Sequence, residues 1–206
     1  DIEVTVTVSD GELIDTEVFT LTVLPVNDAP VLSEVANSSI NENEIFEYTL
    51  QANDIDGDDL IFVATSDNNS NIIINNNELT VLPENNFNGN IEITITVYDN
   101  SSSDSGVFTL EVLPVNDPPE LSFIGSKTTD EDTDLVINLS ANDIDGDNLV
   151  FSADVDANAS ISINQDILIL SPDDNYNGDI EVTVTVSDGE LIDTEVFTLT
   201  VLPVND

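Results

Sequence analysis

Apolar and polar residues alternate along much of this chain. The alternation is clearest near the C-terminus, where every second position is apolar: Ile180, Val182, Val184, Val186, Phe197, Leu199 and Val201. Glu181, Thr183 and Thr185 stand between them, and Ser187-Asp188-Gly189 marks a turn. A period of two is typical of half-buried β-strands. This segment therefore predicts two strands that bury one face.

Earlier segments carry the same alternation. With an opening strand near 119–124 they predict seven short strands and no helix, with inward positions at Leu135, Ile137, Leu139, Ala141, Leu149, Phe151, Ala153, Ile161, Ile163, Leu168 and Leu170. Positions 89 residues earlier are also apolar: Phe46, Tyr48, Leu50, Ala52, Leu60, Phe62, Ala64, Leu79 and Val81. Seven alternating strands in about 89 residues predict an all-β, seven-stranded immunoglobulin-like sandwich.

Two smaller features complete this expectation. Phe87 and Tyr176 are equivalent positions just before the sixth strand, and we expect an apolar plug there, because Phe has no hydroxyl. The Asn- and Ser-rich stretch 66–77 is expected to be a flexible loop with a short strand.

The chain is a tandem array. Residues 1–28 are identical to residues 179–206, and residues 90–117 are a diverged copy of both. A spacing of 89 residues is one whole domain, since most solenoid repeats are about 20 to 50 residues long. We therefore divide the chain into the last strands of a preceding repeat (1–28), a first repeat (29–117) and a second repeat (118–206). Residues 1–28 alone form a marginal hairpin, which would be ordered only with a partner.

Charge and composition exclude many functions. The chain has 43 acidic residues and one basic residue, for a formal net charge of −42. Nucleic acids and anionic membranes would be repelled, because both are bound through Lys and Arg. Counter-ions among the carboxylates would relieve the self-repulsion. Ca²⁺ and Mg²⁺ favour oxygen ligands, so a divalent cation is the first partner expected.

The absent residue types narrow the chemistry further. The chain has no Cys, His, Met or Trp, which excludes disulfides, thiolate or imidazole zinc sites and Cys or His nucleophiles. Paired carboxylates alone could catalyse, as in glycosidases, but no basic or aromatic subsite accompanies them. We expect no enzyme and no catalytic residue. No segment could insert into a membrane or resembles a signal peptide, so any export signal would lie outside this fragment.

Acidic residues recur at the 89-residue spacing, mostly at predicted strand ends. The recurring pairs are Asp28 and Asp117, Glu42 and Glu131, Asp54 and Asp143, Asp56 and Asp145, Asp58 and Asp147, Glu84 and Asp173, and Asp99 and Asp188. The tightest groups are 53–58 and 142–147, which place carboxylates on alternate residues beside a Gly. That pattern can direct several oxygens at one hard cation. It is not an EF-hand, because the Glu at the twelfth loop position is missing.

Four motifs occur in the same order in the array. They are Ala-Asn-Asp-Ile-Asp-Gly-Asp (52–58 and 141–147), Asp-Glu-Asp-Thr (130–133), Asn-Phe-Asn-Gly or Asn-Tyr-Asn-Gly (86–89 and 175–178), and Pro-Val-Asn-Asp before Ala-Pro or Pro-Pro (25–30 and 114–119). Together they resemble cadherin-like domains of the bacterial tandem type, found in large secreted adhesins. The resemblance covers the whole chain.

The resemblance implies Ca²⁺ at the junctions between successive repeats. The first repeat would supply Glu42 and Glu84, and the linker and second repeat would supply Asn116, Asp117, Asp143, Asp145, Asp147 and Asp188. The corresponding residues around the other linker are Asn27, Asp28, Asp54, Asp56, Asp58 and Asp99, and those at the far end are Glu131 and Asp173. Pro25, Pro114 and Pro203 replace an acid of typical cadherin linkers, so we expect fewer ions per junction.

These features predict a calcium-stiffened spacer of an extracellular or cell-surface bacterial adhesin, whose partners are Ca²⁺ and neighbouring repeats. The main alternative is a module that binds a glycan or another cadherin-like protein. An exposed aromatic platform would distinguish it, and Tyr48, Tyr98 and Tyr176 are the only tyrosines available for one. A third interpretation is that the acidic residues are an adaptation to high salt and bind no specific metal. Such an adaptation would scatter acidic residues over every face of the domain. The outward threonines of the last strands could also form a ladder for sugar or ice, although Thr is common on exposed strand faces.

Overall fold

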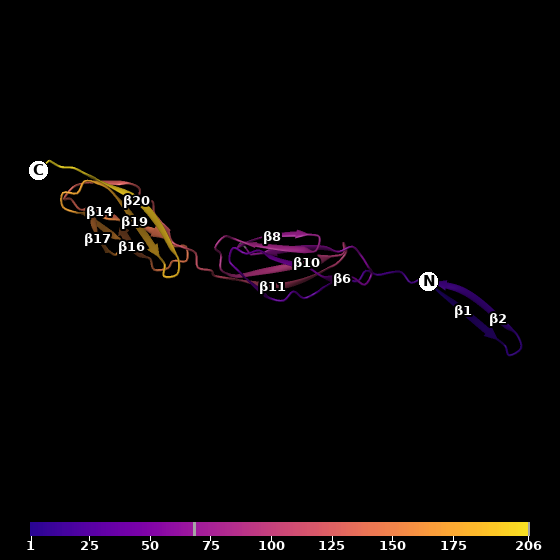
Figure 1. The fold of residues 1–206 in the computed structure, drawn as a ribbon. Helices are drawn as coiled ribbons and strands as arrows, with labels where there is room; N and C mark the ends of the chain where they lie inside the picture. Colours follow the sequence, from indigo (N-terminus) through magenta and orange to yellow (C-terminus); the bar gives the residue numbers. More distant parts are fainter. Residues whose placement is uncertain (68, 206) are drawn as a thin grey trace. The chain divides into compact units, whose positions relative to one another are not determined.

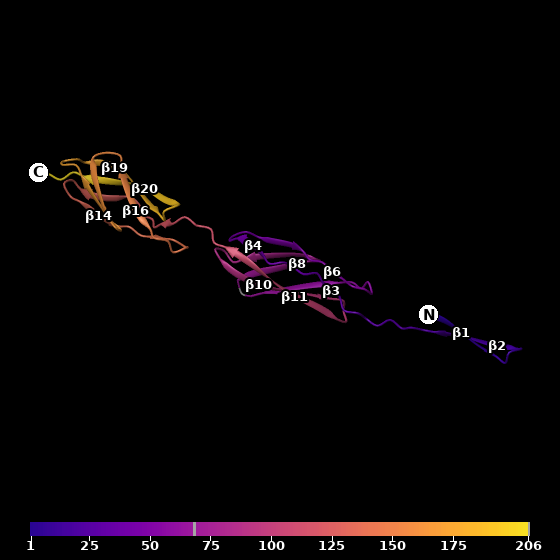
Figure 2. The same cartoon turned by 90° about the horizontal axis from the view of Figure 1, so that it is seen from below.

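The computed structural model describes residues 1–67 and 69–205, and in this part of the chain all regular structure is β. The chain divides into two units, Asp1–Leu113 and Pro114–Asp206. The first unit contains the N-terminal hairpin and the first repeat, and the second unit contains the second repeat (Figures 1 and 2). The all-β, sandwich-like fold predicted from the alternation is confirmed.

The first repeat pairs its strands in two main sheets and one short one. The main sheets have the orders β4-β11-β10-β7 and β5-β9-β8, and β3 pairs with β6. The strands are β3 (Val31–Leu32), β4 (Ser38–Asn41), β5 (Phe46–Thr49), β6 (Ala52–Asn53), β7 (Ile61–Ser66), β8 (Ser70–Asn75), β9 (Glu78–Pro83), β10 (Gly89–Tyr98) and β11 (Ser103–Leu113). The strand expected in the stretch 66–77 is β8; Asn68 lies outside the described residues.

The second repeat has the same topology. Its main sheets have the orders β13-β20-β19-β16 and β14-β18-β17, and β12 pairs with β15. The strands are β12 (Glu120–Leu121), β13 (Lys127–Asp130), β14 (Leu135–Asn138), β15 (Ala141–Asn142), β16 (Val150–Val155), β17 (Ala159–Asn164), β18 (Ile167–Pro172), β19 (Gly178–Ser187) and β20 (Ile192–Leu202). Within this repeat every pairing except that of β13 with β20 is antiparallel, as in a Greek-key type of sandwich.

The inward positions expected from the alternation form the core of each repeat. In the second repeat Ile180, Val182, Val184 and Val186 are completely buried, and the strands of the other sheet add Leu168 and Leu170. One expectation is wrong. Tyr48 is 37% exposed, and its ring stacks on Phe46 with 6.3 Å between ring centroids. The ring of Tyr48 therefore lies beside Phe46 and outside the core cluster of the first repeat.

The opening strand differs from the single strand expected near 119–124. It is divided in two: β12 pairs antiparallel with β15, and β13 pairs parallel with β20 in the opposite sheet. The segment between β12 and β13 therefore crosses from one sheet to the other. Two carboxylates hold this crossover, because Asp193 accepts from the backbone N–H of Leu121 (2.8 Å) and Glu195 accepts from those of Ile124 and Gly125 (2.7 and 2.9 Å).

The aromatic residue before the sixth strand packs against the core in both repeats, as expected. The ring of Phe87 lies against Gly89, and the ring of Tyr176 lies against Gly178. In both glycines φ is positive (134° and 143°), so a side chain at either position would meet strain as well as the ring. The hydroxyl of Tyr176 additionally donates to the carbonyl of Asp179 (3.0 Å), a bond that Phe87 cannot form.

The N-terminal hairpin exposes the face that its identical copy buries. β1 (Ile2–Ser9) and β2 (Ile14–Leu21) pair only with each other. Val6 and Phe19 are 54% and 49% exposed, whereas the same residues of the copy, Val184 and Phe197, are 0% and 4% exposed. The sequence is the same, so the difference comes from the facing sheet β14-β18-β17, which the hairpin lacks.

Deleting residues 1–28 is therefore expected to leave the first repeat folded. The hairpin contributes no buried side chain to the core cluster of that repeat, which begins at Leu32. Thermal unfolding followed by circular dichroism should remain cooperative. A shorter deletion of residues 1–26 is the control, because Asn27 and Asp28 bond to Asp99 and Asp56. Loss of cooperative unfolding in both deletions would refute the division at residue 28.

Candidate metal centre

The loop after β6 holds three carboxylates together. Asp54, Asp56 and Asp58 each place a carboxylate oxygen within 4.8 Å of the others, and Asp143, Asp145 and Asp147 do the same after β15. Oδ1 of Asp54 accepts from the backbone N–H groups of Asp56 (2.9 Å) and Gly57 (3.0 Å), which folds the loop back on this side chain. Gly57 has φ +80°, a conformation that glycine adopts without strain.

The second oxygen of the leading aspartate is left for another ligand. Oδ2 of Asp54 and Oδ2 of Asp143 are buried and have no hydrogen-bond donor among the described residues. Oδ2 of Asp117 in the linker is in the same condition. A buried carboxylate oxygen without a partner is costly. A hard cation would satisfy it, and the oxygen-only donor set of these loops fits Ca²⁺ or Mg²⁺.

Linker residues join this loop in each unit. The backbone N–H of Asp28 donates to Oδ2 of Asp56 (2.8 Å), and that of Asp117 donates to Oδ2 of Asp145 (2.8 Å). Asn116 donates through Nδ2 to Oδ2 of Asp188 (2.9 Å). An amide that donates through nitrogen keeps its oxygen as an acceptor. The linker therefore bonds to the three-carboxylate loop through Asp117 and to the loop after β19 through Asn116.

The aspartate after the sixth strand is fixed in the same way in both repeats. In the first unit Asn27 donates to Oδ2 of Asp99 (2.9 Å), and Ser101 and Ser102 donate to its Oδ1 (2.7 and 2.6 Å). The side chain of Asn27, followed by the backbone N–H groups of Ser102 and Ser101, lowers the pKa of Asp99. A lowered pKa means that this stabilisation is complete at neutral pH and is lost only as the pH falls below the ordinary value of 3.8.

Asp188 has equivalent bonds in the second unit. The backbone N–H of Leu191 is the largest cause of its lowered pKa, followed by the side chain of Asn116 and the backbone N–H of Glu190. The carboxylate stays ionised at any pH at which a calcium site would operate.

Asp58 shows the opposite electrostatics. Its pKa is raised, first by desolvation and then by the negative charges of Asp54, Asp56 and Asp99. A raised pKa means that the fold disfavours the ionised form of Asp58. At neutral pH, where the group is ionised, this costs stability. A divalent cation among these groups would reverse the cost, because it replaces repulsion with attraction.

The remaining predicted ligands lie at the other end of each repeat. Glu42 follows β4, Glu131 follows β13, and both are buried, whereas Glu84 and Asp173 are exposed after β9 and β18. Their loops meet: Asn43 donates to Asn86 (2.9 Å), and Asn175 donates through its backbone N–H to Asp132 (2.9 Å). Within the described residues, none of these four acids belongs to a three-carboxylate group.

Some recurring acids have a structural role that the sequence did not indicate. Asp104 and Asp193 also recur at 89 residues, and they accept from the backbone N–H groups of Leu32 (2.9 Å) and Leu121 (2.8 Å). Glu131 accepts from the backbone N–H of Val204 (2.7 Å). The recurrence could have identified Asp104 and Asp193, but not whether they hold a cation or the backbone.

Family comparisons agree with this architecture. Residues 115–202 match the family described as cadherin-like domain, and residues 27–111 match the family described as bacterial Ig domain. Domains of these two families are typically extracellular and non-enzymatic. No curated protein sequence matches the chain. Among the described residues, no helix has the length and apolarity needed to cross a bilayer.

Solved structures show the fold. Drosophila N-cadherin EC1-4 is 18% identical with a TM-score of 0.54, and the match covers 87% of this chain and 50% of that chain. Human protocadherin-24 EC1-2 is 16% identical with a TM-score of 0.55, covering 85% of this chain and 100% of that chain. An endo-fucoidan hydrolase of glycoside hydrolase family 107 is matched over 99% of this chain but only 34% of its own length, with 15% identity and a TM-score of 0.40.

Proposed function

We propose, from the premise that this chain is built of bacterial cadherin-like domains, that it is a calcium-binding spacer of a large extracellular adhesin or surface protein. The observation that carries the proposal is the buried Oδ2 of Asp54 and of Asp143, which have no donor among the described residues and each lie in a group of three carboxylates. No N–H or O–H donor among the described residues reaches these oxygens, and Lys127 is the only basic side chain of the sequence, so a bound cation is the partner that would compensate their charge.

The mechanism is a linkage between ion binding and linker order. The linker carboxylate of Asp117 and the loop carboxylates of Asp143 and Asp145 belong to the same unit, and hydrogen bonds already place the linker against the loop. A cation bound by all three would replace their mutual repulsion with attraction. The linker would then be held rigidly against the sandwich. A spacer needs this rigidity.

Residues of the preceding repeat would complete the ligand set, as the family resemblance implies. Glu42 and Glu84 are the candidates, and their loops meet through Asn43 and Asn86. Pro114 stands where typical cadherin linkers have an acid, so fewer ions per junction are expected. We extend the same assignment to Asn27, Asp28 and the first-repeat loop, and to Glu131 and Asp173 with a following repeat.

The distribution of acids favours a specific cation over general adaptation to salt. The outward positions of β19, β20 and β16 carry mainly Ser, Thr and aliphatic residues, and the grouped carboxylates lie in the loops. Adaptation to salt would place carboxylates on the sheet faces as densely as in the loops, whereas these faces carry only a few, such as Asp154 and Glu181. The parent protein would meet Ca²⁺ outside the cell, where these families typically occur.

Calorimetric titration of the full chain with Ca²⁺ tests the proposal directly. We expect saturable binding, and Asp58→Asn should weaken it about tenfold or more, because the variant removes a ligand charge. Without Ca²⁺ the same variant should melt at a higher temperature than the parent, since desolvation and then repulsion from neighbouring carboxylates raise the pKa of Asp58 and disfavour its charged form.

Asp59→Asn is the matched control. Asp59 is exposed and is the next residue along, but it does not belong to the three-carboxylate group. Equal weakening by Asp58→Asn and Asp59→Asn would indicate diffuse counter-ion attraction, and an absence of binding heat and of any effect on melting would contradict the calcium assignment.

A further inference from the structure

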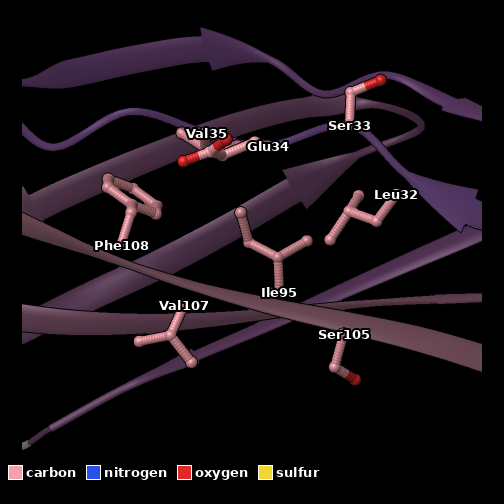
Figure 3. A pocket seen from close by; sticks show the side chains of 9 residues that line it. Leu32, Ser33, Glu34, Val35, Ile95, Ser105, Val107 and Phe108 are labelled. Atoms are coloured by element: carbon pink, nitrogen blue, oxygen red, sulfur yellow. The ribbon is translucent and has the colours of Figure 1, made fainter.

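A cavity of about 220 Å³ lies in the first repeat, away from the acidic loops. It is bounded by the segment after β3 on one side and by β10 and β11 on the other. Figure 3 shows Leu32, Ile95 and Phe108 around the same space, with Val35 and Glu34 on the facing segment. Val107 and Ser105 point away from it. The walls are therefore mainly apolar, and the one charged lining residue is the exposed Glu34.

The residue difference between the repeats that bears most directly on this space is at position 106 of the first repeat. Gly106 stands in β11 where Glu195 stands in β20 of the second repeat, 89 residues later. In the second repeat the Glu195 side chain reaches the crossover, and its two oxygens accept from the backbone N–H groups of Ile124 and Gly125. Gly106 has no side chain, so the corresponding space in the first repeat is left open.

The crossover of the first repeat retains the donors that Glu195 satisfies in the second. The equivalents of Ile124 and Gly125 are Val35 and Ala36, and their backbone N–H groups have no acceptor among residues 1–67 and 69–205. An apolar cavity beside unused backbone donors is a site for a ligand with an apolar part and an acceptor oxygen. The second repeat shows which acceptor geometry the crossover accommodates.

Charge decides the class of acceptor. A free carboxylate would imitate Glu195, but it would have to approach a chain with a net charge of −42 and the exposed carboxylate of Glu34. A neutral acyl carbonyl has one oxygen with two lone pairs, which can accept from both N–H groups without that repulsion. We propose that the cavity beside Gly106 binds the acetamido group of an N-acetylated sugar, with the methyl among Leu32, Ile95 and Phe108 and the carbonyl oxygen on the Val35 and Ala36 N–H groups.

The volume agrees with a substituent rather than a whole ligand. Pockets that enclose a drug-sized molecule measure about 300 to 1,000 Å³, and an apolar cavity of about 150 Å³ holds one benzene ring. The cavity of the first repeat lies between these sizes. The sugar ring would remain outside, next to the hydroxyl of Ser33 and other polar surface, so affinity would come from many repeats or many glycan residues acting together.

Nuclear magnetic resonance titration of the full chain with N-acetylglucosamine tests this site. We expect saturable shifts of the backbone signals of Val35 and Ala36 and of the Ile95 methyl signals. Glucose, which has no acyl group, should cause none. Gly106→Glu should abolish the shifts by supplying the missing side chain, and Glu195→Gly should create a second set at Ile124 and Gly125.

Each alternative outcome has a definite meaning. Gly106 has no positive φ, and an added Cβ would meet only the end of the Leu32 side chain at 3.3 Å, so Gly106→Glu should fold. Unchanged signals for the buried Ile91 and Val97 would verify this. Shifts with propionate but not with N-acetylglucosamine would show that the site binds a carboxylate and would overturn the assignment of a neutral acyl group. Equal shifts with glucose, or no shift with any probe, would refute the site.

Discussion

Addition of Ca²⁺ is expected to raise the melting temperature of the full chain, and excess chelator is expected to lower it. A ligand that binds only the folded state at 100 times its dissociation constant stabilises that state by about 2.7 kcal/mol. A difference of this size shifts the melting temperature of a domain of about 100 residues by roughly 10 °C or more. Differential scanning calorimetry at several Ca²⁺ concentrations measures the effect.

Screening must be separated from binding, because a chain with 43 acidic residues is stabilised by any salt. NaCl at matched ionic strength is the control. Millimolar Ca²⁺ should act far more strongly than the matched NaCl, and the removal of Ca²⁺ should reverse the effect. Equal stabilisation by both salts would support the salt-adaptation interpretation, and a melting curve unchanged by excess chelator would remove calcium from the account of stability.

The sequence predicted the strands well because one face of each strand is buried. An alternation such as that of β19 leaves few other structures possible, since a shift by one residue would place Val182 and Val184 in solvent. Tyr48 was misplaced because alternation does not distinguish a central position from the edge of the core. The crossover after β12 was missed because paired segments of two and four residues leave no periodic signal.

The candidate site was predictable in part. The recurrence at 89 residues identified the carboxylates of the loop after β6, and the structure brings Asp54, Asp56 and Asp58 together. Recurrence alone does not separate metal ligands from structural acids, since Asp193 recurs at the same spacing and anchors β12. The cavity beside Gly106 could not be predicted, because it depends on the path of the crossover and on the difference between Gly106 and Glu195.

Asp145→Ala is expected to release the linker without unfolding the second repeat. The side chain of Asp145 lies in an exposed loop, belongs to the three-carboxylate group and accepts from the backbone N–H of Asp117. Its removal takes away one ligand charge and the bond to the linker together. Small-angle scattering with Ca²⁺ should show a narrow distribution of shapes for the parent and a broad one for the variant, with the same β circular dichroism for both.

Two further variants separate the causes. Asp145→Asn keeps an oxygen that can accept from Asp117 but removes the charge, so it should resemble Asp145→Ala if the ion orders the linker, and the parent if the hydrogen bond is sufficient. Asp154→Ala removes an exposed acid from β16, away from the three-carboxylate groups, and should scatter like the parent. If the parent is equally flexible with and without Ca²⁺, these acids are local loop sites, and a calcium-stiffened spacer is excluded whatever the calorimetry shows.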